Sequence, residues 1–121
     1  MQLNTQHPEV RRVLQALIED ARAGVPILLS RRERYGAILG DFRVQFEGED
    51  DLLHLSITRV DGGRISHEDA QRIADLFFHS VPKGLIYSRP AEYSVHYYLA
   101  HDVLVKYLDA STVADRPNPG F

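Results

Sequence analysis

The sequence predicts a single α+β domain: a mainly antiparallel sheet of about five strands with two or three helices packed on one face. Three observations support this fold class. Two segments repeat apolar residues at helical spacing, several shorter segments alternate apolar and polar residues, and polar turns join these shorter segments. Strands joined by short turns pair antiparallel, which leaves the helices to cover one face of the sheet. The expected order of elements is αβββαββα.

The length of the chain, 121 residues, suits one domain and is too short for two. We expect the domain to occupy residues 1–111 and the Pro-rich stretch 112–121 to form a flexible tail. The absence of cysteine excludes disulfide frameworks, thiol nucleophiles and thiolate zinc sites. No apolar run approaches the ~20 residues that span a bilayer, and the first residues lack the layout of a signal peptide. We therefore expect a cytoplasmic protein without a membrane partner.

The first helix is expected over residues 8–23. Its apolar residues recur at three- and four-residue spacing and form one stripe: Val10, Val13, Leu14, Leu17, Ile18 and Ala21. Pro8 suits the first helical turn, where its missing N–H is not needed, and Gly24 is typical of a helix end. The other face is expected to be solvated and carries Arg11, Arg12, Glu19 and Arg22.

Three strands are expected after this helix. Residues 25–30 form a short apolar segment, which Pro26 confines to a sheet edge or a strand start. Residues 36–46 alternate in polarity, which predicts one inward face formed by Ile38, Phe42, Val44 and Phe46. A polar turn over residues 47–51 leads to a strand with Leu53, Leu55 and Ile57 inward and His54, Ser56 and Thr58 outward. Residues 36–60 are thus expected to form a hairpin.

The second half of the chain begins with a helix capped by Ser66, with Asp69 three residues later. Its apolar stripe runs from Ala70 to Val81, after which Pro82 closes the helix. Residues 85–88 and 93–100 are expected to pair as a hairpin. Residues 101–110 suit either a helix or a strand, and the capping residues near their start favour a helix.

Five of the six tyrosines fall within 21 residues near the end of the chain. On a strand, His96 and Tyr98 share one face and Tyr97 lies on the other, so one tyrosine-bearing face must meet solvent, a ligand or another chain. Tyrosine is enriched at protein interfaces because it joins a large apolar area to a polar tip. The candidate interface or ligand residues are Arg89, Tyr93, His96, Tyr97, Tyr98 and His101.

A second candidate site is the segment SRRERY, residues 30–35. Arg31, Arg32 and Arg34 can grip phosphates while Tyr35 stacks on a base. The alternative is a solvated turn whose arginines pair with the acidic turn at 47–51. Three arginines are few for a nucleic-acid reader, and the net charge of −3 gives no general attraction to nucleic acid.

The leading functional interpretation is a non-enzymatic protein-binding, adaptor or regulatory module that forms a homodimer through its tyrosine-rich sheet region. One alternative is a nucleic-acid-binding module that uses the arginine segment. Another is a small ligand-binding domain or enzyme, in which His96 or His101 acts as general base and Arg89 holds an anionic substrate.

Neither catalytic residues nor a cofactor can be assigned from the sequence. No nucleophile, base and orienting group can be assembled from the spacing, and the histidines lack the i, i+4 pair of a helical metal site, so no metal is predicted. The order of elements is similar to that of small dimeric secretion-chaperone-like domains. No motif is shared with them, so the similarity concerns the fold and implies no function.

Overall fold

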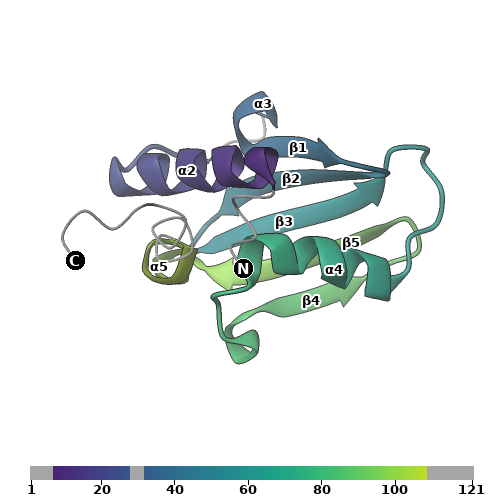
Figure 1. Ribbon diagram of the computed structural model, residues 1–121. Coiled ribbons are helices and arrows are strands. Elements are labelled where there is room, and N and C mark those ends of the chain that lie inside the picture. Colours follow the sequence, from purple (N-terminus) through teal and green to yellow (C-terminus); the bar gives the residue numbers. More distant parts are fainter. Residues whose placement is uncertain (1–6, 28–31, 109–121) are drawn as a thin grey trace, which may run out of the picture.

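The computed structural model describes residues 7–27 and 32–108, and Figure 1 shows their arrangement. The fold is α+β, as the sequence predicts. Its helices are α2 (Pro8–Arg22), α3 (Arg32–Tyr35), α4 (His67–Phe78) and α5 (His101–Val103), with a short 3₁₀ turn η2 (Lys83–Leu85) and a π-helical turn η3 (Leu104–Leu108). The strands are β1 (Gly36–Leu39), β2 (Phe42–Glu49), β3 (Leu52–Arg59), β4 (Tyr87–Pro90) and β5 (Ser94–Ala100).

The five strands form one antiparallel sheet in the order β1-β2-β3-β5-β4. The chain leaves the sheet after β3, forms α4, and returns through β4 at the far edge before β5 pairs with β3. Both long helices lie across the same face of the sheet, α2 on the side of β1 and α4 over β3 and β5 (Figure 1). We call this helix-covered side the inner face and the opposite side the outer face.

Helix α2 begins and ends as its sequence predicts. Pro8 occupies its first turn. At the other end, Gly24 has a φ of +73°, Gly24 N donates to Ala21 O at 3.2 Å, and Val25 N donates to Asp20 O at 2.8 Å. This pair of bonds is a Schellman motif, which satisfies carbonyls that the end of a helix leaves unpaired. The side chain of Arg12 is half-exposed, as expected of this face, and its guanidinium also donates to Gly36 O at 2.7 Å and to Glu33 O at 3.0 Å.

The expected single strand over residues 36–46 is two strands joined by a tight turn. Leu39 pairs with Phe42, so Gly40 and Asp41 form a two-residue hairpin loop, and Gly40 has a φ of +63°. The turn reverses the alternation: Ala37 pairs with Val44 on the inner face, and Ile38 lies on the outer face, 55% exposed. The prediction that Ile38 points inward was therefore wrong.

The expected strand over residues 25–30 is not present in its described part, residues 25–27, and residues 28–30 lie outside the described residues. Ile27 is nevertheless buried, and its carbonyl oxygen accepts from Gly48 N at 2.7 Å. The segment thus reaches β2 through a backbone hydrogen bond. The structure has three strands between the two long helices, as many as expected, but β1 and β2 both begin within the segment that was expected to be one strand.

The second half of the chain follows its predicted course. Ser66 caps α4 by accepting from Asp69 N at 3.1 Å. Strands β4 and β5 form a hairpin, although β4 begins later than expected, at Tyr87. Residues 101–108 are helical, as the capping residues favoured, and the expected tail over 112–121 lies outside the described residues.

The hydrophobic core lies between the inner face and the two long helices. Leu53, Leu55 and Ile57 of β3 are fully buried, as predicted. Phe46 of β2 contacts the rings of Phe77 and Phe78 edge-to-face, at centroid distances of 5.2 and 6.0 Å. Among the described residues, no helix is both long enough and apolar enough to cross a membrane.

Candidate functional site

The outer face of the sheet carries the main group of predicted site residues. Burial alternates along β3 and β5, with every second residue buried and the residues between them partly exposed. Within the described residues both long helices lie on the inner side, so the outer side chains are left accessible (Figure 1). Those of the three strands β3, β5 and β4 include His54, Ser56, Ser94, His96, Tyr98, Tyr87 and Arg89.

An aromatic row crosses three strands of this face. The ring of His54 on β3 stacks on that of Tyr98 on β5, with centroids 4.7 Å apart and an interplanar angle of 6°. The ring of Tyr87 on β4 lies 6.3 Å from that of Tyr98. The row is set by the sheet register, because Tyr98 is paired with His54 on one side and with Tyr87 on the other. It ends at the free edge of the sheet, where Tyr87 is 65% exposed.

Two exposed apolar side chains lie on the same face as this row, one beside it and one across the sheet. Leu52 precedes His54 on the same side of β3 and is 42% exposed, and Ile38 projects from β1. Large apolar residues on an uncovered sheet face indicate a binding surface when they are grouped with aromatic residues. The outer face combines both features, with Tyr87 at one edge and Ile38 at the other.

A chain of polar contacts runs beside the aromatic row. Ser94 Oγ lies 2.9 Å from His96 Nε2, and His96 Nδ1 lies 2.8 Å from His54 Nε2. On the far side, His54 Nδ1 lies 3.8 Å from Glu49 Oε2. The contact between the two rings requires one N–H donor and one bare nitrogen, so at most one of these two nitrogens carries a proton.

The carboxylate of Glu49 favours one arrangement of protons on the ring nitrogens of His54 and His96. A proton on His54 Nδ1 faces Glu49, which leaves His54 Nε2 bare to accept from His96 Nδ1–H. His96 Nε2 is then bare and accepts from the hydroxyl of Ser94. Partial burial lowers the pKa of His96, and the positive charges of a protonated His54 and of Arg89 act in the same direction. His96 is thus arranged as a neutral acceptor, which is the form that a general base requires.

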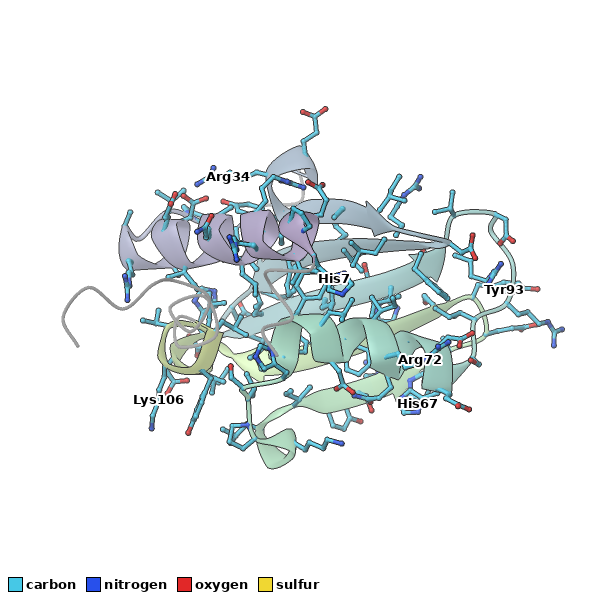
Figure 2. The ribbon with its side chains drawn as sticks, in the orientation of Figure 1. His7, Arg34, His67, Arg72, Tyr93 and Lys106 are labelled. Atoms are coloured by element: carbon cyan, nitrogen blue, oxygen red, sulfur yellow. The ribbon has the colours of Figure 1, made fainter. Side chains whose placement is uncertain are left out.

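The structure separates the six candidate residues predicted near the end of the chain. Arg89 is paired with His96 in the sheet register. Tyr98 lies on the same face, two residues after His96 on β5. Tyr93 lies in the turn between β4 and β5 at one end of the sheet, whereas α5, which begins at His101, lies at the other end (Figures 1 and 2). His101 is therefore separated from His96 by most of the length of β5, and the two cannot share one small ligand.

Tyr97 lies on the inner face, 1% exposed, and so does not share a surface with Tyr98. Burial raises the pKa of its hydroxyl to about 12, and the negative charge of Asp75 contributes to the same shift. Its ring also stacks against that of His67 at the start of α4, with centroids 6.4 Å apart. Tyr97 belongs to the environment of α4 and not to the aromatic row.

The arginine segment is tied to helix α2. Arg34 Nε donates to Asp20 Oδ2 at 2.7 Å and Arg34 Nη2 donates to Asp20 Oδ1 at 3.0 Å, a bidentate pair. Tyr35 also donates its hydroxyl to Asp20, and its side chain is fully buried, so neither face of the ring is free to stack on a base. Arg34 thus pairs with Asp20 and Glu19 of α2, and not with the acidic turn at 47–51 that the sequence suggested. Arg31 and the side chain of Arg32 lie outside the described residues.

Sequence reasoning missed three members of the polar chain, Ser94, His54 and Glu49. The alternation did place His54 and His96 on outward faces of their strands. What the sequence could not show was that β3 and β5 are neighbours, with Ser56 opposite His96 and Tyr98 opposite His54. The two strands are neighbours because the chain crosses over through α4 and places β4 at the edge of the sheet.

Among the described residues, no group of three or more histidine, aspartate or glutamate side chains is placed to hold a metal ion. Comparison with protein-family models, with curated proteins and with solved structures finds no match to this chain.

Proposed function

We propose that this protein is a protein-binding module that forms a homodimer through the outer face of its sheet. The observation that carries the proposal is the aromatic row of His54, Tyr98 and Tyr87, which ends at an exposed sheet edge. Tyrosines on a rigid sheet bury large areas at a small cost in side-chain entropy, which favours their use as anchors. A cytoplasmic location is part of this proposal.

A two-fold symmetric contact suits this surface. In such a contact each copy uses the same patch, so one set of residues must be complementary to itself. The outer face has apolar and aromatic groups that can pack against their own copies, and it carries charges of both signs, including Arg89, Arg43 and Glu49. Opposite charges can then meet across the two-fold axis instead of repelling.

The test of this proposal is the association state of matched variants. Tyr87→Glu places a charge in the row at an exposed position, so it should weaken the dimer at least about tenfold without disturbing the fold. Tyr93→Glu is the control, because Tyr93 is also an exposed tyrosine, at 53%, but lies in the end turn. Sedimentation equilibrium should give twice the chain mass of 13.8 kDa for wild type and Tyr93→Glu. A wild-type monomer at all concentrations would contradict the proposal.

A second candidate function, acyl transfer at Ser94, is favoured by the Ser94–His96 contact. As Ser94 Oγ attacks an acyl carbon, His96 Nε2 takes the hydroxyl proton and later gives it to the leaving group, and water then releases the acyl group. The tautomer set by His54 and Glu49 would hold His96 in the accepting form. A fluorophosphonate probe should label wild type and not Ser94→Ala. Equal labelling of both proteins, or of neither, would remove this candidate.

A further inference from the structure

A cavity on the opposite side of the sheet from the aromatic row has features of a ligand site. It has a volume of about 700 Å³ and lies between helix α4, the segment that follows α4, and the edge strand β4. Its apolar wall includes Phe78, Val81 and Ile86. Its polar lining includes Gln71, Asp75, His79, Lys83, Ser88 and Tyr97. The aromatic row does not contribute to it.

The hydroxyl of Tyr97 is the unusual group in this cavity. It is shielded from solvent and has no hydrogen-bond partner among the residues that the structure describes. Buried hydroxyls are normally paired, because an unpaired one lowers the stability of the fold. A hydroxyl retained in this state, in the lining of a cavity, indicates that a bound group supplies the missing partner.

The carboxylate of Asp75 indicates the chemistry of that partner. Asp75 is close enough to Tyr97 for its negative charge to raise the pKa of the hydroxyl. Gln71 Nε2 donates to Asp75 Oδ1 at 2.9 Å, and a carboxylate has accepting capacity beyond one such bond. An anionic group beside Asp75 would be repelled, whereas an ammonium group can donate both to the carboxylate and to the hydroxyl oxygen.

We propose that this cavity binds a primary ammonium group carried on a short apolar stem. The ammonium lies between Asp75 and Tyr97, and the stem packs against Phe78 and Ile86. The ammonium of Lys83 is on a flexible stem in the exposed turn η2, so it can turn into solvent or meet an acceptor at the outer end of the ligand. The amine can come from a free small molecule or from a lysine side chain of another protein.

The test is an NMR titration of the ¹⁵N-labelled full chain with n-butylammonium, and with butyrate as the anion of similar size. Butylammonium should shift the amide signals of Asp75, Ser88 and Tyr97 in a saturable manner, and butyrate should not. Equal or stronger binding of butyrate would overturn the charge assignment. A glycine-flanked, end-blocked lysine peptide then identifies the source: tighter binding than butylammonium indicates a protein lysine, and equal binding indicates a free amine.

Two variants and a control test the assignment of residues. Asp75→Asn should weaken butylammonium binding about tenfold or more, because it removes a charge-assisted bond. Glu68→Gln removes a charge from the same helix outside the cavity and should bind as wild type. Equal loss of binding in both variants would mean non-specific attraction and would overturn the proposal.

Tyr97→Phe gives an independent result in the absence of ligand. It removes the unpaired hydroxyl and keeps the ring, so the free protein should unfold at a higher urea concentration while butylammonium binds more weakly. A lower unfolding midpoint would show that the hydroxyl already has a partner in the folded protein, which contradicts the proposal.

Discussion

At the scale of single residues, Asp20 shows how one carboxylate joins two parts of the chain. It is 8% exposed, and it receives hydrogen bonds from Arg34 and from the buried hydroxyl of Tyr35. A buried carboxylate requires such donors, because its desolvation is otherwise costly. Arg34 and Tyr35, which the sequence offered as phosphate- and base-binding residues, therefore fix α3 to the last turns of α2.

Tyr35→Phe tests this role. The change keeps the ring and removes one donor to Asp20, so the free energy of unfolding should fall by about 1–3 kcal/mol. Glu19→Gln is the control: Glu19 lies 3.5 Å from Arg34 and its side chain is 71% exposed, so its loss should change stability by less than about 0.5 kcal/mol. Urea unfolding measures both. Equal effects of the two variants would count against a structural role for the buried bond.

The lowered pKa of His96 predicts how the free energy of unfolding depends on pH. Its pKa in the folded protein is below the ordinary value of 6.5, so the unfolded chain takes up a proton first as the pH falls. The contribution of His96 to the free energy of unfolding is fully present above about pH 6.5. It decreases as the pH falls from there toward the lowered pKa. His96→Asn should remove this part of the decrease, measured by urea unfolding at several pH values. An unchanged pH profile in the variant would contradict the assignment.

At the scale of elements, the helix ends were predicted correctly from local signals, whereas one tight turn made the predicted strand faces wrong. The cap at Ser66 and the end at Gly24 are local signals, and both helices follow them. The Gly40–Asp41 turn is also local, but the alternation of residues 36–46 predicts one strand that continues through it. A two-residue loop makes residues 39 and 42 partners, so the inward positions are odd-numbered before the turn and even-numbered after it. Ile38 was assigned to the wrong face for this reason.

Gly40→Ala tests the importance of that turn. The φ of +63° is unfavourable for a residue with a Cβ atom, so the free energy of unfolding should fall by about 1–2 kcal/mol. Gly84→Ala is the matched control, because a Cβ there meets open space and the backbone is not in the left-handed region. Thermal or urea unfolding compares the two. A smaller effect at Gly40 than at Gly84 would show that the turn does not specify the hairpin.

At the scale of the whole molecule, the sequence was sufficient for the fold class and for the side of the sheet that the helices cover. Alternation along residues 94–100 predicted that Tyr97 and Tyr98 face opposite ways, as the structure shows. The contacts between elements were not predictable: the pairing of Asp20 with Arg34, and the His54–His96 contact, depend on which strands and helices become neighbours. The candidate site depends on that arrangement, because its aromatic row takes residues from β3, β5 and β4, whose order in the sheet differs from their order in the sequence.

The most direct measurement of the proposed function is an isotope-filtered NOE experiment on a mixture of labelled and unlabelled full-length chains. The outer-face dimer predicts NOEs between chains from the ring protons of Tyr87 and Tyr98. Contacts between chains that involve only α2 or α4, or the absence of any contact between chains at high concentration, would contradict it.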